Sequence, residues 1–251
     1  MRAINPYLEI LKKAQDTESS TTIFPDLLAE CGLDNVDCPK CGNTGYILRQ
    51  TDGELFSKEC SCMAKRRSIR RLTRSNMSDM LSHYTFDSYE TPDDYRVRVK
   101  HLAKKFAEDD TGWFFISGKS GSGKTHLCTA ICSRLIERDN DVYYMKWRDE
   151  SRSLKAIINT EEVDERLDKL KRVHVLYVDD FFKGGCNDAD IRLAFEIIND
   201  RYNDSKLRTV ISSEMTMEQI IAADEALGSR IYERSRGYML SSPKENWRLR
   251  A

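Results

Sequence analysis

The stretch Gly118-Lys119-Ser120-Gly121-Ser122-Gly123-Lys124-Thr125 constrains this chain more than any other part of its sequence. It matches the phosphate-binding loop pattern, in which a glycine and four residues precede Gly-Lys-Thr. The run from Gly112 to Ser117 before it is apolar and aromatic, and predicts a buried strand. His126 to Arg138 predicts a helix, because apolar residues recur on one face (Leu127, Ala130, Ile131, Leu135 and Ile136). A strand, a glycine-rich loop and a helix in this order allow backbone N–H groups to surround phosphates. We therefore predict a nucleoside triphosphate site, against the alternative of a chance match in a glycine turn.

The bulk composition is that of an ordinary soluble chain, with 32% charged and 40% hydrophobic residues. A length of 251 residues accommodates one large domain, or a domain of about 150–170 residues with a small module. The net charge of −1 gives no global field, so contact with nucleic acid would require a local patch. No apolar run approaches the ~20 residues of a membrane span, and Met1 to Pro6 contain no apolar signal core. We expect a cytoplasmic protein without membrane contact.

Two cysteine pairs lie in the first part of the chain, Cys38-Pro39-Lys40-Cys41 and Cys60-Ser61-Cys62. Between them, Tyr46-Ile47-Leu48 and Leu55-Phe56 flank Asp52-Gly53, a typical hairpin turn. Four cysteines arranged around a hairpin predict a zinc ribbon, with zinc in a closed, structural site. The second pair has one residue between its cysteines rather than the commoner two. A redox dithiol or unrelated thiols are the alternatives.

The remaining cysteines have less specific surroundings. Cys31 lies close enough in sequence to substitute for one zinc ligand. Cys128, Cys132 and Cys186 fall in the predicted nucleotide-binding domain, where we expect them to be packing residues.

The first 83 residues predict a small module and a linker. Short helices are expected over Pro6–Ala14 and from about Phe24 to Gly32, and both are too short to be stable alone. Lys65 to Arg74 carries six cations and no acid. This basic run either lines a nucleic-acid path or meets an acidic protein surface, or it is a solvated linker helix. We expect a zinc-binding module over residues 1–62, a basic linker helix over 63–83 and an ATPase domain over 84–251.

Beyond the phosphate loop, apolar strands alternate with helices. The strands are expected at Val142–Met145, Val173–Val178, Thr209–Ser213 and Tyr238–Ser241, and the helices at 149–171, 188–202 and 216–236. This alternation predicts an α/β fold, a parallel sheet with helices on both faces. Ligands of such sheets bind at the carboxyl ends of the strands. The phosphate loop and Asp179-Asp180 are both expected there.

The predicted site residues can be given chemical roles. Lys124 would neutralise the β- and γ-phosphates, and the Thr125 hydroxyl would hold Mg2+. Asp179 suits the second shell of Mg2+, and Asp180 suits polarisation of the attacking water. The alternative for the two aspartates is a helix cap or a turn.

Two later positions are further candidates. Ser213, at the end of its strand, would donate to the γ-phosphate, whereas a carboxylate at Glu214 is electrostatically awkward beside a triphosphate. Arg230, within Gly228-Ser229-Arg230-Ile231, can reach the γ-phosphate of a neighbouring subunit as an arginine finger. A surface ion pair with Glu233 or Asp224 is the alternative for Arg230.

Together these residues resemble replicative-helicase loaders of the DnaC/DnaI type, which are bacterial or phage AAA+ ATPases. The resemblance rests on the four cysteines, the basic run with Tyr84-Thr85-Phe86, the phosphate loop, Val178-Asp179-Asp180, Asn199-Asp200-Arg201-Tyr202 and Gly228-Ser229-Arg230-Ile231. It implies a P-loop AAA+ domain and a zinc module that docks on a hexameric replicative helicase. It also implies binding of ATP and single-stranded DNA, weak ATP hydrolysis and ATP-dependent self-association.

Residue by residue, Lys124 and Thr125 match the Walker A pair, Asp179 and Asp180 the Walker B pair, and Arg230 the arginine finger. Family members commonly have Ser-Asn where this chain has Ser213-Glu214, which puts brisk hydrolysis in doubt. Ten residues follow Ser241, so no helical lid is expected. The nucleotide would then be held by the loop, by His126 next to it, and by Phe86 or Tyr89 from the entry segment.

Other functions share parts of this pattern. A transposition-helper ATPase has a similar core, usually without four cysteines, and an adaptor that binds ATP without hydrolysing it would explain Glu214. A P-loop kinase fits the zinc module and the paired aspartates poorly. The candidates for DNA contact are the basic run 65–74 and the stretch with Arg148, Arg152 and Lys155, where a solvated face is the default.

Overall fold

The computed structural model describes residues 37–51, 54–74, 78–157 and 160–242. The chain divides into two compact units, residues 1–60 and 61–251, which we describe separately. Within the described ranges, no helix is both long enough and apolar enough to cross a bilayer. The helices expected before residue 33, and Cys31, lie outside the described residues.

A two-stranded antiparallel hairpin forms the described part of the first unit. Strand β1 (Tyr46–Thr51) pairs with β2 (Glu54–Glu59), and the register runs from Tyr46 opposite Glu59 to Thr51 opposite Glu54. The hairpin predicted between the two cysteine pairs is therefore confirmed. Its Asp52-Gly53 connection lies outside the described residues.

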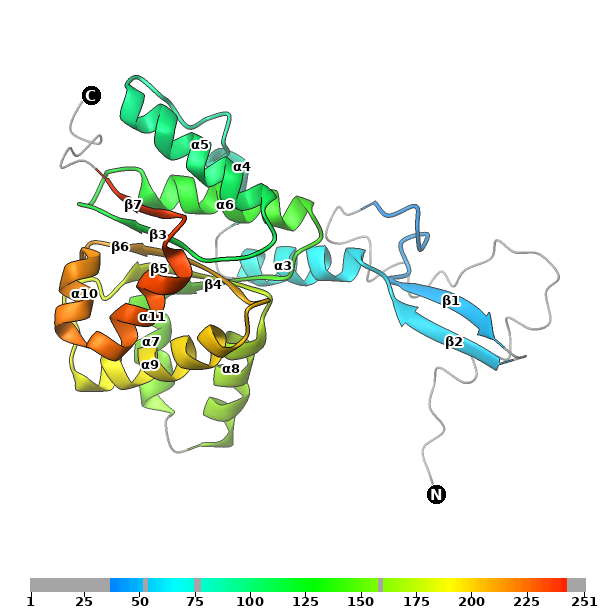
Figure 1. Cartoon of the computed structure of the whole chain (residues 1–251). Coiled ribbons are helices and arrows are strands. Elements are labelled where there is room, and N and C mark those ends of the chain that lie inside the picture. The colour runs from blue at the N-terminus through cyan, green and yellow to red at the C-terminus, as the bar shows by residue number, and fades with distance from the viewer. Residues whose placement is uncertain (1–36, 52–53, 75–77, 158–159, 243–251) are drawn as a thin grey trace. The chain divides into compact units, whose positions relative to one another are not determined.

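The second unit is built on a five-stranded sheet in the order β4-β5-β6-β3-β7, and every pairing in it is parallel. The strands are β3 (Phe114–Ser117), β4 (Val142–Lys146), β5 (Val175–Phe181), β6 (Arg208–Ser213) and β7 (Met239–Ser241). All residues of β3 and β6 are buried, which is typical of a parallel sheet covered on both faces. The predicted α/β architecture is confirmed (Figure 1).

Helices cover both faces of this sheet (Figure 1). Along β3, Phe114 and Ile116 join one hydrophobic cluster and Phe115 joins the other, as the two-residue period of a strand requires. The first cluster includes residues of α5 (Asp94–Glu108) and α6 (Lys124–Glu137). The second includes residues of α7 (Trp147–Ala156), α8 (Glu161–Arg172), α9 (Asp188–Asn203), α10 (Met217–Ala223) and α11 (Glu225–Ser235).

Local sequence explains where several helices begin. Asn187 and Asp190 form a capping box at the start of α9, and Thr216 and Gln219 form another at α10. The side chain of Asp93 accepts from the backbone N–H of Arg96 and caps α5, a helix that the sequence interpretation did not include. These caps satisfy N–H groups that would otherwise have no partner in the first turn.

Residues 63–83, expected to be a linker, form α3 (Cys62–Arg74) and α4 (Ser78–His83). The basic stretch lies in helix α3, which belongs to the second unit. The Ser68 hydroxyl accepts from the backbone N–H of Val142 at 2.8 Å, and Arg67 pairs with Asp141 at 3.4 Å. Helix α3 thus covers the outer edge of β4. The proposed boundaries at residues 62 and 83 remain a prediction about independent folding.

Candidate nucleotide and metal sites

The phosphate loop connects β3 to α6. Gly118 has a φ of 153°, and a Cβ atom there would lie 2.6 Å from the Cβ of Ser242. Gly123 has a φ of 88° and would place a Cβ 3.4 Å from the ring of Tyr89. Both positions lie in the backbone region that favours glycine. The glycines of the motif therefore allow this loop to pass close to β7 and to the entry segment.

Lys124 lies at the first position of α6 with its ammonium group turned back over the loop. Its Nζ donates to the carbonyl oxygens of Gly118 at 2.7 Å and Lys119 at 2.9 Å. Burial lowers the pKa of Lys124, and the nearby carboxylates of Glu214 and Asp180 act against that effect. The charge of Lys124 is thus held at the centre of the loop, where phosphate oxygens would replace carbonyl oxygens.

Asp179 is a buried carboxylate on which four hydroxyl groups converge. Its Oδ1 accepts from Ser212 at 2.6 Å, Tyr177 at 2.8 Å and Thr125 at 3.3 Å, and its Oδ2 accepts from Tyr144 at 3.2 Å. Burial and the negative charge of Asp179 raise the pKa of Tyr177. The structure thus brings together Thr125 and Asp179, the pair expected at Mg2+, and oxygen ligands are those that Mg2+ prefers.

Asp180 and Glu214 lie close to a lysine that the motif does not include. The regular pairing of β5 with β6 is interrupted between Val178 and Phe181, and Asp180 has a φ of 55°. Its carboxylate accepts from Lys183 Nζ at 2.8 Å, and the same ammonium lies 3.6 Å from Glu214. The residue expected to polarise water therefore forms an ion pair with Lys183.

A pocket of about 320 Å3 brings these groups together. Its walls include the loop from Ser120 to Thr125, His126, Met80 and Tyr84, and three charged side chains (Asp180, Lys183 and Glu214). The pocket has the charges and the open backbone expected of a triphosphate site.

Some predicted residues do not line this pocket, namely Gly118, Lys119, Phe86, Tyr89, Asp179, Ser213 and Arg230. Ser213 is fully buried: its hydroxyl donates to the carbonyl of Phe181 at 2.7 Å and accepts from the N–H of Met215 at 3.0 Å. Its only proton is thus already donated, and its role as a γ-phosphate donor stays a prediction. Phe86 lines a separate hollow between α5 and α6, with Lys104 and Arg134.

The aromatic residue at the nucleotide pocket is Tyr84 rather than Phe86. Its ring stacks on His126, with centroids 4.8 Å apart and planes inclined by 23°. Tyr89 meets the other side of His126 edge-on. A ring nitrogen of His126 lies 3.0 Å from the carbonyl oxygen of Thr85. His126 therefore fixes the entry segment beside the loop. The sequence signal for Tyr84 was its place in Tyr84-Thr85-Phe86.

Arg230 lies on α11, away from the pocket of its own chain. Its Nη1 donates to the carbonyl oxygen of Ala226 at 2.7 Å, and its guanidinium lies 5.0 Å from the ring centroid of Phe195. Among the described residues Arg230 forms no ion pair with Glu233, which instead accepts a hydrogen bond from Tyr202. A residue that serves a neighbouring subunit must lie outside its own pocket, and Arg230 meets this condition. Its role as an arginine finger stays a prediction.

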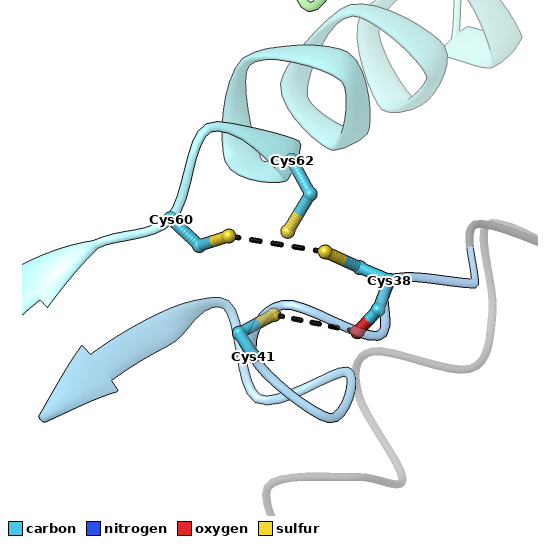
Figure 2. Close-up of side chains that lie close together, drawn as sticks. All are labelled: Cys38, Cys41, Cys60 and Cys62. Carbon is cyan, nitrogen blue, oxygen red and sulfur yellow. Dashed lines mark hydrogen bonds between the residues drawn. The ribbon is translucent and has the colours of Figure 1, made fainter.

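Cys38, Cys41, Cys60 and Cys62 form a buried cluster (Figure 2). Their sulfur atoms all lie within 4.8 Å of one another, and Cys38 Sγ is 3.8 Å from Cys60 Sγ. Tetrahedral zinc with bonds of ~2.3 Å spaces its sulfurs by about 3.8 Å. The N–H of Gly45 donates to Cys41 Sγ at 3.4 Å, a contact that would stabilise a thiolate. The four predicted ligands therefore fit zinc.

The other cysteines of the second unit are packing residues, as expected. Cys128 and Cys132 are fully buried on α6, and Cys186 packs at the rim of the other hydrophobic cluster. Burial raises the pKa of Cys128 and Cys132, which keeps both thiols neutral.

The model of a family described as IstB-like ATP binding protein matches residues 48–248. The chain belongs to this family. ATP binding is therefore assigned to the protein.

Three relatives of this IstB-like protein match most of its length. It is 28% identical over 255 residues to the phage-like element PBSX protein XkdC of Bacillus subtilis, covering 95% of this chain and 92% of XkdC. It is 26% identical over 172 residues to the replicative helicase loader DnaC of Escherichia coli K12, covering 66% and 69% of the two chains. It is 30% identical over 202 residues to the uncharacterized protein YqaM of Bacillus subtilis, covering 74% of this chain and spanning 64% of that relative's length.

Solved structures establish the fold. The crystal structure of DnaI matches with a TM-score of 0.56 and 23% identity, covering 66% of this chain and 93% of DnaI. That of the DnaC helicase loader matches with a TM-score of 0.58 and 20% identity, covering 65% and 98%. The IstB-like chain therefore has a DnaC/DnaI-like AAA+ fold, and its predicted resemblance to these proteins is confirmed.

Proposed function

We propose that this protein loads a hexameric replicative helicase onto single-stranded DNA in the bacterial cytoplasm, with ATP as the assembly and release switch. The observation that carries the proposal is its similarity to E. coli DnaC, which is named a replicative helicase loader, in a chain with a formed phosphate pocket. The similarity to XkdC supports a phage-type member of this group.

In this proposal, ATP occupies the pocket beside the loop from Gly118 to Thr125. Lys124 binds the terminal phosphates, and Thr125 and Asp179 hold Mg2+, which would neutralise charge between the β- and γ-phosphates. Asp180 polarises the attacking water. Hydrolysis is weak in the isolated chain, because Arg230 acts only on a neighbouring copy after ATP-dependent self-association.

The four-cysteine cluster has the role of a structural zinc site. Four thiolates fill the coordination shell and leave no open position for chemistry. The cluster would hold the ends of the β1–β2 hairpin in one geometry, and this module would dock on the helicase.

The DNA contact lies on one of two basic elements. On α7, Arg148 and Arg152 are exposed, whereas Lys155 pairs with Asp190 at 2.6 Å. On α3, Arg67 pairs with Asp141. If α7 makes the contact, reversing Arg148 and Arg152 should weaken DNA binding and flatten its salt dependence.

Two other functions share the nucleotide site. A transposition-helper ATPase is favoured by the family description alone, and bound zinc together with helicase association would exclude it. An adaptor that binds ATP without hydrolysis is favoured by Glu214, which lines the pocket. Multiple turnovers of ATP that disappear in Lys124→Ala would exclude the adaptor.

Association of the purified protein with candidate hexameric helicases tests the proposal. We expect a complex whose stability differs between ATP, ADP and no nucleotide, and we expect Lys124→Ala to remove that difference. Lys206→Ala, at an exposed lysine distant in sequence from the loop, is the matched control. Lack of any complex in all three nucleotide states would refute the proposed function.

A further inference from the structure

Lys183 is a cation in the nucleotide pocket that belongs to none of the recognised motifs. Its ammonium group lies between two carboxylates, 2.8 Å from Asp180 Oδ2 and 3.6 Å from Glu214 Oε1. All three side chains line the same pocket as Lys124. Lys183 thus stands at the wall of the pocket formed by the ends of β5 and β6.

The backbone fixes the direction of Lys183. Asp180 and Phe182 have φ values of 55° and 56°, which are strained and uncommon for residues other than glycine. The rings of Phe181 and Phe182 are buried and stacked with centroids 4.0 Å apart, and Trp147 packs edge-on against both. This buried aromatic cluster holds the strained turn that places Lys183 next to Asp180.

The charges of the pocket require a cation at this position. Asp180 and Glu214 both line the pocket that ATP would enter, and carboxylates repel a phosphate. The Lys124 ammonium donates to the carbonyl oxygens of Gly118 and Lys119. A lysine has a flexible stem and three donors, so Lys183 can exchange a carboxylate for a phosphate oxygen by a small rotation.

We propose that Lys183 distinguishes a bound triphosphate from a diphosphate. Without nucleotide its ammonium neutralises Asp180 and Glu214. With a triphosphate it turns to the terminal phosphate, which releases the Asp180 carboxylate to polarise water. This inference rests on the proposed placement of ATP in the pocket, and it gives Glu214 a role: it holds Lys183 in place until a γ-phosphate arrives.

The competing explanation is a purely structural ion pair. Partly exposed ion pairs contribute little to stability. Such a pair would affect the folded protein equally whichever nucleotide is bound. If Lys183 senses the γ-phosphate, its removal should weaken binding of the triphosphate alone. The ratio of the affinities for ATP and ADP therefore distinguishes the two explanations.

Calorimetric titration of the full chain with Mg-ADP and with a non-hydrolysable Mg-ATP analogue measures this ratio. We expect Lys183→Ala to weaken binding of the ATP analogue by roughly tenfold or more, because a charge-assisted hydrogen bond to phosphate is lost. Binding of ADP should change by less than about threefold. Lys183→Arg should retain most of the preference, and Lys206→Ala should match the wild type.

A second substitution tests the role assigned to Glu214. Glu214→Gln removes a negative charge that faces the phosphate, so it should strengthen binding of the ATP analogue. In the Lys183→Ala background it should restore part of the lost affinity, which a double-mutant cycle would detect as coupling.

If Lys183→Ala leaves the ratio of the affinities for the ATP analogue and ADP unchanged, the inference is overturned. Circular dichroism of each variant establishes that the fold is retained. Because no helicase is present in these titrations, a failure of the inference is distinct from a failure of helicase association, which concerns the proposed function.

Discussion

Asp179 illustrates how single residues are prepared for their chemistry in this protein. Four hydroxyl groups from β4, β5, β6 and α6 surround its carboxylate, so its orientation is fixed before any ligand binds. Such preorganisation lowers the reorganisation needed when a cation is bound. The sequence motif predicted Asp179 and Thr125, but the tyrosines that hold Asp179 carry no motif.

His126 gives a pH-dependent prediction. Burial lowers its pKa from the ordinary value, so the unfolded chain binds more protons than the folded chain near and below pH ~6.5. The contribution of neutral His126 to stability is therefore present above about pH 6.5 and decreases as the pH falls. Thermal unfolding at pH values from about 8 to about 5 should show a smaller loss of stability in His126→Gln than in the wild type.

His101→Gln is the matched control for that measurement, because His101 is exposed on α5. His101→Gln should lose as much stability as the wild type when the pH is lowered. Equal slopes for the wild type and His126→Gln would contradict a coupling between His126 protonation and folding.

The positions of single side chains are hard to predict from sequence where they depend on contacts between distant parts of the chain. The Walker residues were predictable because the loop and its helix are continuous in the chain. Phe86 was predicted at the nucleotide, and that role stays a prediction. The aromatic residue that lines the loop pocket is Tyr84, whereas Phe86 lines the hollow between α5 and α6. Lys183 was not predicted, because a left-handed turn directs it back toward Asp180.

Among the elements, α3 shows how a sheet edge is protected. The Ser68 hydroxyl accepts from the buried N–H of Val142, and its proton lies within reach of the carbonyls of Ala64 and Asn140. An unpaired edge strand would be prone to aggregation. The helix joins the cysteine cluster at Cys62 to the edge of the ATPase sheet.

Ser68→Ala should lower the free energy of unfolding by about 1–3 kcal/mol, because it leaves the N–H of Val142 buried without a partner. Ser235→Ala is the control, since Ser235 is also fully buried but donates only within its own helix. Ser235→Ala should lower the free energy of unfolding by about 1 kcal/mol or less. Chemical denaturation measures both values, and equal effects would contradict the role of Ser68 at the sheet edge.

The strands were predictable because each is a short apolar run that ends before polar residues. Strand β5 extends to Phe181, past the predicted end at Val178, because Asp179 is buried by its hydroxyl partners. Helix α5 was missed, since its surface is rich in lysine and arginine and only a narrow stripe is buried, which includes Val99, Ala103 and Phe106. The packing of α3 against β4 is a long-range contact that a local pattern does not contain.

For the molecule as a whole, we expect zinc at the cysteine cluster to be needed for helicase association but not for nucleotide binding. Elemental analysis of the purified protein should find one zinc per chain, and Cys38→Ser should lower this content strongly. Cys186→Ser, outside the cluster, should retain it. Nucleotide binding should survive in Cys38→Ser, because the phosphate pocket is built within residues 61–251, whereas helicase association should be lost. Zinc content unchanged by Cys38→Ser would contradict this site.

The central claim is that the protein places a ring-shaped helicase on DNA under the control of ATP. A circular single strand has no ends, so a closed hexamer can encircle it only if the ring is opened. Incubation of helicase, circular single-stranded DNA and this protein should give salt-resistant helicase on the circle with ATP. Lys124→Ala should not support that loading. Equal loading of helicase with and without this protein would contradict the account.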